Sequence, residues 1–169
     1  MNILAGRLKT VEVNSTTLSQ KHIIPQVMDR MTIFNYMIGN TDWSVPNQHN
    51  CKILSGNDFS QPGLGIIIPY DFDYSGLVNT DYAVPYDGLG LKSVLERRYL
   101  GICRTRDEYI SSLKEFTDKK TELYNVINEF PLLDEKVKKE MRRYLDEFYY
   151  SIEKGNDIIN NFERGCIKL

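Results

Sequence analysis

Three polar side chains, Asp42, Asn50 and Asp71, have the types and positions that phosphoryl-transfer chemistry needs. Asp42 opens a polar loop after Gly39, a residue typical of a helix end. Asn50 comes directly before a short apolar run, and Asp71 comes directly after a second one. Phosphoryl transfer requires a carboxylate that orients the attacking hydroxyl and hard oxygen ligands that hold Mg²⁺ on the phosphates. Carboxylate and carboxamide oxygens suit Mg²⁺ far better than imidazole or thiolate groups do.

The two apolar runs beside these residues predict a β-hairpin. They cover 51–54 and 64–70, and a turn signal at 55–58 and a loop through 61–63 lie between them. Residues that flank neighbouring strands at the same end of a hairpin lie side by side. We therefore expect Asp42, Asn50 and Asp71 around one cleft. The irregular stretch 39–90 is long, and a compact domain usually places function in such loops.

A helix is predicted on the amino-terminal side of the Asp42 loop. Apolar residues at helical spacing indicate a helix from about Leu18 to Ile38. Its regular part should begin near Pro25, because proline is tolerated only in a first turn. Gly39 is expected to end it. Residues 7–13 alternate in polarity, which is typical of a short strand or an extended segment.

The carboxyl-terminal half is predicted to be helical. We expect helices at about 92–100, 106–129 and 134–154, and a last one from 156. Two apolar faces indicate core packing. They comprise Leu113, Phe116, Leu123, Val126 and Ile127 on the first, and Val137, Met141, Tyr144, Leu145, Phe148 and Ile152 on the second. The expected fold is mainly α with a small β-hairpin, an α+β arrangement in a single domain over residues 1–169.

The order of these features resembles the carboxyl-terminal lobe (C-lobe) of protein-kinase-like domains. The stretches Ile-Gly-Asn-Thr-Asp-Trp at 38–43, His-Asn at 49–50 and Pro-Tyr-Asp-Phe-Asp at 69–73 carry the resemblance. They look like the loops of spore-coat-protein kinases, of the toxin kinases of bacterial persistence modules, and of kinase-like proteins of Bacteroidetes type. Those families use a Gly-Asn-x-Asp loop, a later Asn, and a Pro-aromatic-Asp segment in place of the DFG motif.

The resemblance implies a role for each polar residue. Asp42 takes the position of the catalytic residue, and Asn50 and Asp71 take the positions of metal ligands for Mg²⁺ or Mn²⁺ with ATP. Asp73 replaces the glycine of the motif and is either a further metal ligand or a structural acid. Asn47 matches the motif's spacing of five residues after Asp42. We prefer Asn50 as the metal ligand because it directly precedes the strand.

The resemblance covers the C-lobe only, and we expect an incomplete chain without the amino-terminal lobe. Nothing before Asp42 resembles the glycine-rich loop or the strand lysine that grip the phosphates. The expected function is ATP- and metal-dependent transfer to an unknown protein or small-molecule acceptor, by phosphorylation or by AMP transfer. Two alternatives stay open. One is a pseudokinase-like binding module without catalysis, and the other is a helical interaction protein whose Asp and Asn residues only form turns.

Composition restricts the other partners. The chain of 169 residues has a formal net charge of −2, so no strong field attracts nucleic acid or an anionic membrane. No apolar run reaches the roughly 18 residues that a membrane span needs. The cysteines Cys51, Cys103 and Cys166 lie far apart and form no zinc spacing. We expect them to be buried free thiols in a cytoplasmic protein.

Several neighbouring residues have simpler interpretations. Residues 71–76 imitate the start of an EF-hand loop, but Tyr82 occupies the twelfth position, where a bidentate Glu is required. Trp43 is expected to anchor the core. His49 is expected to orient its loop or to bond backbone, since no Cys or His lies at zinc spacing from it. Arg97 and Arg98, on the helix predicted at 92–100, are expected to meet a phosphate, a loop carboxylate or a helix-face ion-pair partner.

Overall fold

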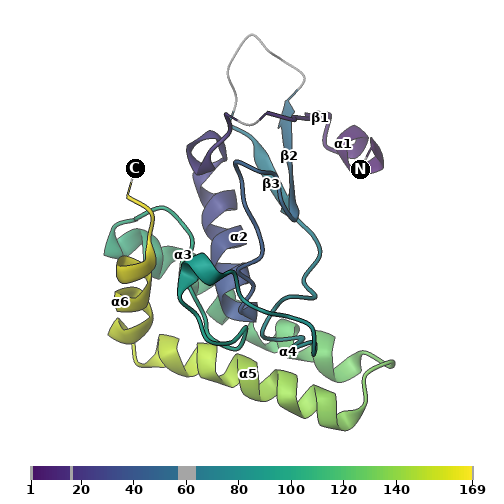
Figure 1. Ribbon diagram of the computed structural model, residues 1–169, viewed down its shortest axis with the longest axis vertical. Coiled ribbons are helices and arrows are strands. Elements are labelled where there is room, and N and C mark those ends of the chain that lie inside the picture. The colour runs from purple at the N-terminus through teal and green to yellow at the C-terminus, as the bar shows by residue number, and fades with distance from the viewer. Residues whose placement is uncertain (1, 16, 57–63, 169) are drawn as a thin grey trace.

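The chain folds into a small antiparallel sheet and a larger helical body, as the computed structural model of residues 2–15, 17–56 and 64–168 shows (Figure 1). The strands lie in the order β1-β2-β3 and comprise Thr10–Glu12, Cys51–Gly56 and Ile66–Pro69. Cys51 lies opposite Pro69 at the end of the β2–β3 ladder. The predicted hairpin and the short strand predicted within 7–13 are therefore confirmed. Residues 57–63, which include part of the predicted turn and loop, lie outside the described residues.

Helix α2 (Pro25–Ile38) runs through the middle of the molecule (Figure 1). Pro25 stands in its first turn, where the missing N–H removes no internal hydrogen bond. Gly39 ends the helix in the left-handed conformation, with φ 68°. The prediction of this helix is confirmed from Pro25 onward, whereas residues 20–22 form a separate 3-10 helix, η1. A short helix that the sequence did not indicate, α1 (Asn2–Arg7), precedes β1.

The carboxyl-terminal body contains the helices α3 (Arg106–Asp118), α4 (Lys120–Glu129), α5 (Glu135–Glu153) and α6 (Asn156–Gly165). Helix α5 lies across the base of the molecule, and α6 rises from its end (Figure 1). The start of α5 is fixed by Asp134, whose carboxylate accepts a hydrogen bond from the backbone N–H of Val137 at 2.8 Å. The expectations of helices at 134–154 and from 156 are confirmed, and the fold belongs to the α+β class as predicted.

Two buried clusters share α2 as their common wall. The first is rich in aromatic residues and joins α2 to α3, α5 and α6; its rings include Tyr36, Tyr99, Tyr109, Phe148 and Phe162. The second joins α2 to the sheet through Met28, Met31, Trp43, Ile53 and Ile67. Trp43 is 8% exposed, which confirms its predicted place in the core. Because α2 contacts both clusters, the loop that follows it is held between the sheet and the helical body.

The helix predicted at 92–100 is wrong. Residues 91–100 form turns and irregular backbone because their side chains are used for tertiary contacts. The Arg97 guanidinium stacks 3.8 Å above the Tyr144 ring and donates to the carbonyl oxygens of Met37 and Tyr144. Tyr99 is buried against Phe162, with ring centroids 4.2 Å apart. These contacts between distant elements outweigh the local helix preference of the segment.

The single helix predicted at 106–129 is also wrong, since α3 and α4 are separated at Lys119. The backbone of Lys119 has φ −96° and ψ 5°, and its N–H bonds to both Glu115 and Thr117. The break redirects the chain so that Phe116 and Ile127 both reach the core. Val126, which the sequence placed on the core face, is 68% exposed.

The cysteine prediction is wrong for two of the three residues. Cys103 and Cys166 form a disulfide that joins the segment before α3 to the end of α6. Cys51 is a free thiol and is buried, as expected. Within the described part of the chain, no helix combines the length and the apolar character that crossing a bilayer requires.

Candidate functional site

The loop after α2 is positioned by a buried pair of asparagines. Asn40 is 2% exposed, and its amide nitrogen Nδ2 donates to the Asn35 Oδ1 at 2.8 Å. The Asn40 Oδ1 in turn accepts a hydrogen bond from the backbone N–H of Asp42 at 3.0 Å. Asn35 is itself fixed by a bond from its Nδ2 to the carbonyl oxygen of Met31. A buried amide network of this kind specifies one conformation, so α2 determines where Asp42 lies.

Both carboxylate oxygens of Asp42 are held by side chains from the end of the same loop. The His49 Nε2 lies 2.9 Å from Asp42 Oδ1, and the Asn50 Nδ2 donates to Asp42 Oδ2 at 2.9 Å. The same Asn50 nitrogen also bonds to the Asp42 backbone carbonyl oxygen at 2.9 Å. Asn50 has φ 50°, a left-handed conformation that asparagine tolerates better than most residues. The expectation that His49 orients the loop is confirmed, through Asp42 itself.

The hairpin joins this loop to Asp71. The backbone N–H of Tyr70 donates to the carbonyl oxygen of Asn50 at 3.0 Å, just beyond the last residue pair of the β2–β3 ladder. Asp71 follows Tyr70 and also has a left-handed backbone, with φ 60°. A hydrogen bond that the Asp71 carboxyl donates to Asp73 and the negative charge of Asp73 raise the pKa of Asp71, and the charge of Asp42 acts in the same direction. Asp71 is therefore close enough to Asp73 and Asp42 for their charges to act on it.

Asp73 is braced by the loop that follows it. The Tyr82 hydroxyl donates to Asp73 Oδ2 at 2.9 Å, and the Thr80 hydroxyl donates to the Asp73 carbonyl oxygen at 3.1 Å. The hydrogen bond between Tyr82 and the Asp73 carboxylate raises the pKa of the Tyr82 hydroxyl. Asp73 therefore has a structural partner on one oxygen while it faces Asp71, so the geometry is compatible with either role that the sequence left open for it.

The donor set at this site suits a hard cation. The described residues contain no group of three or more His, Cys, Asp and Glu side chains at metal-binding distances. Asn50 directs its amide nitrogen to Asp42, which leaves its oxygen Oδ1 available as a ligand, and Asp71 adds a carboxylate at the paired end of the hairpin. Mg²⁺ is usually bound by one or two carboxylates and completes its shell with water and substrate phosphates. Two or three protein oxygens are therefore compatible with the Mg²⁺ or Mn²⁺ ion that the sequence implies.

The remaining residues of the predicted site fall outside this cluster. Asn47 is exposed, and its backbone N–H bonds to the Ser44 hydroxyl at 3.4 Å. Asn50, three residues further along the chain, is the asparagine that contacts Asp42. Arg97 forms an ion pair with Glu147 on α5 at 3.3 Å, and Arg98 donates to the Leu89 carbonyl oxygen. The expectation that these arginines lie on a helix is wrong. Of the partners expected for them, Arg97 has an ion-pair partner, and Arg98 meets a backbone carbonyl oxygen instead.

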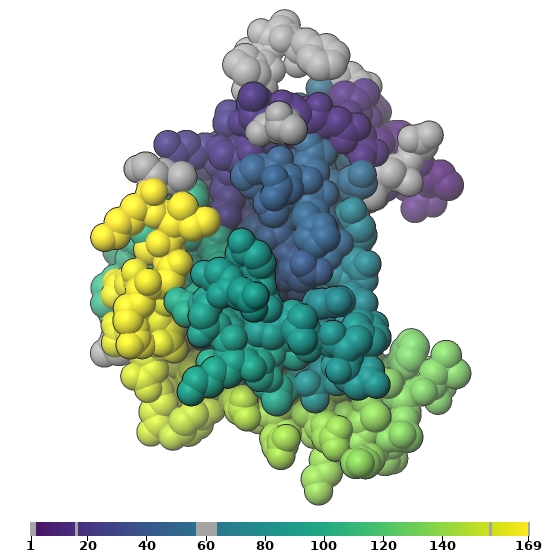
Figure 2. Space-filling model, in the orientation of Figure 1, coloured from purple at the N-terminus to yellow at the C-terminus, as the bar shows by residue number. Residues whose placement is uncertain are grey.

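The segment after Asp73 forms one wall of a cavity beside Asp42. The cavity has a volume of about 330 Å³, and its lining residues come from the Asp42 loop and from the 74–87 segment. In the space-filling view the teal segment that follows β3 crosses the front of the molecule, above α5 (Figure 2). The sequence placed function in this irregular region but did not single out Asp87, which lines the cavity together with Tyr86.

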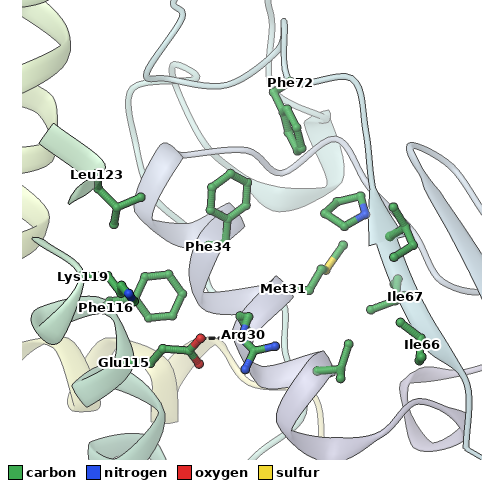
Figure 3. Close-up of a pocket in the computed structure, with 13 residues that line it drawn as sticks. Arg30, Met31, Phe34, Ile66, Ile67, Phe72, Glu115, Phe116, Lys119 and Leu123 are labelled. Atoms are coloured by element: carbon green, nitrogen blue, oxygen red, sulfur yellow. Dashed lines mark hydrogen bonds and ion pairs between the residues drawn. The ribbon is translucent and has the colours of Figure 1, made fainter. Parts of the chain in front are cut away.

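A larger groove lies between α2, β3 and the α3–α4 junction (Figure 3). Its volume is about 530 Å³ and its walls are mostly apolar, with the Arg30–Glu115 ion pair at 2.7 Å on its rim. Phe72 points into this groove and packs edge-on against Phe34, with ring centroids 5.5 Å apart. The packing of Phe72 against Phe34 therefore holds the Asp71–Asp73 segment in place. Asp42, Asn50, Asp71 and Asp73 do not line this groove.

Comparison with known proteins identifies no relative of this chain. No protein-family model matches the chain, and no curated protein and no solved structure is significantly similar to it.

Proposed function

We propose that this chain is a kinase-like phosphotransferase domain with the arrangement of a kinase C-lobe, which uses ATP with Mg²⁺ or Mn²⁺. The observation that carries the proposal is the contact of Asp42 with Asn50, from which the hairpin leads directly to Asp71. The side chains at the two ends of the loop are thus in contact, and Asp71 follows Tyr70, whose backbone bonds to Asn50. Turn-forming residues with no shared role have no physical reason to converge in this way.

Each residue of the site has its own role in the proposed transfer. Asp42 orients the acceptor hydroxyl and receives its proton, because its carboxylate is the most firmly positioned of the three. The Asn50 Oδ1 and the Asp71 carboxylate hold the metal, and Asp73 positions Asp71 through their hydrogen bond. The metal, when bound, supplies positive charge that neutralises the phosphates during transfer. A phosphate-gripping lysine is not assigned within this chain.

A pseudokinase-like binding module is the second candidate, and one observation favours it. Both oxygens of Asp42 accept contacts from His49 and Asn50, so the carboxylate is already occupied before an acceptor arrives. In that case the site would bind nucleotide and metal without transfer. The two candidates predict the same binding and differ only in turnover.

Calorimetric titration of MgATP and MnATP tests the nucleotide site. We expect binding by the wild type and a loss of at least tenfold in affinity for Asp71→Asn, about 1.4 kcal/mol. Asparagine tolerates the left-handed backbone of this position, so the variant removes charge without adding strain. Asp81→Asn, an exposed acid in the next loop, is the matched control and should bind like the wild type. Unchanged binding by Asp71→Asn, or no binding by any of the proteins, would contradict the proposal.

Turnover separates the two candidates. With a transferase, slow ATP hydrolysis in the absence of an acceptor should fall by roughly 10²-fold or more in Asp42→Asn, a size typical for a group that handles a proton. Nucleotide affinity should stay near the wild-type value in that variant. Binding without hydrolysis in the wild type would support the pseudokinase-like alternative.

A further inference from the structure

The cavity beside Asp42 has the location of an acceptor site. Its walls are formed by Thr41 and Asp42, by Tyr74, and by the segment with Val84, Pro85, Tyr86 and Asp87. Asp87 starts the short 3-10 helix η2 (Asp87–Leu89), which gives this wall a defined backbone. A molecule in this space would contact the carboxylate that the proposed function assigns to the acceptor hydroxyl. This inference rests on the proposed function and concerns the chemical class of the acceptor.

The walls of this cavity carry negative charge without compensating cations. Between Lys52 and Lys92 the sequence contains no Lys, Arg or His. Asp87 is exposed and forms no ion pair with any residue that the structure describes. A net negative cavity with low-dielectric walls raises the local concentration of cations.

Lys92 is the cation nearest to Asp87 in the sequence, and it forms no ion pair with any residue that the structure describes. The other cations close to the cavity residues in the sequence have partners. Lys52 forms an ion pair with Glu12 at 3.0 Å, on the β1 side of the sheet. The Arg98 guanidinium bonds to the Leu89 carbonyl oxygen at 3.2 Å, which is a backbone contact and not a carboxylate contact. His49 is bound to Asp42. None of these groups neutralises Asp87.

The apolar part of the cavity is aromatic, which suits an organic cation. Tyr86 is 75% exposed, an unusual degree for a large ring, and it stands directly before Asp87. Tyr74 packs against Tyr82 with ring centroids 5.8 Å apart, and this contact fixes the Tyr74 ring in the cavity wall. Aromatic faces attract ammonium groups, and they do so more strongly when a carboxylate is close by. A purely anionic ligand would find no Lys, Arg or His among the residues that line this cavity.

We propose that this cavity binds the acceptor as a small organic cation that carries a hydroxyl group, such as an amino sugar or an amino alcohol. Its ammonium group lies between Asp87 and Tyr86, and its hydroxyl faces Asp42. In the transfer, the hydroxyl oxygen forms a bond to phosphorus and its proton passes to Asp42. The bond from that phosphorus to the leaving oxygen of ATP breaks, and the electron pair stays on that oxygen. A volume of about 330 Å³ is at the small end of ligand sites, which favours a molecule of sugar size.

The test compares glucosamine with glucose, which share a ring and differ at one substituent that is charged in glucosamine at neutral pH. Each sugar is titrated into the folded protein, and binding is followed by amide chemical shifts in two-dimensional NMR spectra. We expect glucosamine to bind at least tenfold more tightly than glucose, with shifts in the 74–87 segment. Asp87→Asn should weaken glucosamine binding at least fivefold, and Tyr86→Leu should weaken it two- to fivefold. Glu140→Gln, an exposed acid on α5, is the matched control and should leave it unchanged.

Equal affinities for the two sugars, binding of neither sugar, or full affinity in Asp87→Asn would overturn the inference. Asp71→Asn separates it from the proposed function, because that variant should lose MgATP and keep glucosamine. If glucosamine binds selectively while MgATP does not bind, the cation site stands and the phosphotransferase proposal fails. If MgATP binds and the sugars are not distinguished, the phosphotransferase proposal stands and the acceptor class is wrong.

Discussion

At the scale of single residues, Asn40 has more influence on the site than its distance from the chemistry suggests. It is buried, it does not face the cavity, and each of its amide atoms has one partner. The nitrogen holds the end of α2 through Asn35, and the oxygen holds the backbone of Asp42. A side chain without these atoms would leave the Asn35 oxygen buried and unpaired, which is costly.

We therefore expect Asn40→Ala to lower the free energy of unfolding by about 2 kcal/mol, the usual cost of lost buried hydrogen bonds and an unpaired buried acceptor. Urea denaturation followed by circular dichroism measures this change. Asn47→Ala is the control, because this exposed asparagine lies in the same loop, and its effect should stay within about 0.5 kcal/mol. Equal effects of the two substitutions would show that the Asn40–Asn35 pair does not fix the loop.

At the scale of elements, two glycines allow the loops of the candidate site to approach α5. A Cβ atom on Gly39 or on Gly76 would collide with the Tyr144 hydroxyl, and Gly76 donates its backbone N–H to the Gly39 carbonyl oxygen at 3.2 Å. The Tyr144 hydroxyl bonds to the Leu95 carbonyl oxygen at 3.2 Å. The end of α2, the segment after Asp73 and helix α5 thus meet at one crowded point.

Gly39→Ala should destabilise the protein more than Gly90→Ala does. Both glycines have left-handed backbones, with φ 68° and 64°, so both substitutions add about 1 to 2 kcal/mol of backbone strain. Only at position 39 does the new methyl group also meet Tyr144, since the space around Gly90 is open. Thermal denaturation of the two variants measures the difference. Similar melting temperatures would mean that Tyr144 moves aside freely and that the contact does not set the loop position.

The elements also show what the sequence could reveal. Helix α2 was predictable because Pro25, the apolar spacing and Gly39 are local signals, and α5 was predictable from one strong apolar face. The α3–α4 break at Lys119 was not predictable, because no Gly or Pro marks it in the sequence. The irregular 91–100 segment depends on Arg97 and Tyr99 reaching partners far away in the chain. Tertiary contacts of this kind override local preference and leave no mark in a single sequence.

In the candidate site, too, some features follow from local sequence signals and others depend on tertiary contacts. The sequence indicated that Asn50 and the residues after the second strand would be neighbours, because strand ends determine which flanking residues lie side by side, and Asn50 does bond to Asp42 and to Tyr70. It did not indicate that His49 would hold Asp42, that Asn40 would support the loop, or that Asp87 would line a cavity. Those contacts depend on how a loop closes and on a segment more than 30 residues further along, for which spacing gives no rule.

At the scale of the whole molecule, helix α2 ties the sheet to the helical body, and the disulfide closes the body on itself. Asp29 on α2 forms an ion pair with Arg104 at 2.9 Å, next to the disulfide at Cys103. Burial raises the pKa of Asp29 even though Arg104 opposes this effect. On the other side of the bridge, Cys166 follows the last turn of α6, whose residues pack into the aromatic cluster.

Reduction of the Cys103–Cys166 bond should lower the free energy of unfolding by roughly 4 kcal/mol, because the bond closes a loop of 63 residues and restricts the unfolded chain. For a chain of this length the melting temperature should fall by roughly 10 °C. Melting curves with and without a phosphine reductant measure the shift. In Cys166→Ser the reductant should have no effect, since no bond is left to break.

Thiol counting checks the same assignment independently of stability. The folded, oxidised protein should react slowly at every cysteine, because burial raises the pKa of the Cys51 thiol to about 11 and keeps reagents away. Unfolding without reductant should expose one reactive thiol, and unfolding after reduction should expose three. Three thiols in the unreduced protein would mean that Cys103 and Cys166 are neighbours without a bond. The helical body would then depend on its aromatic core alone.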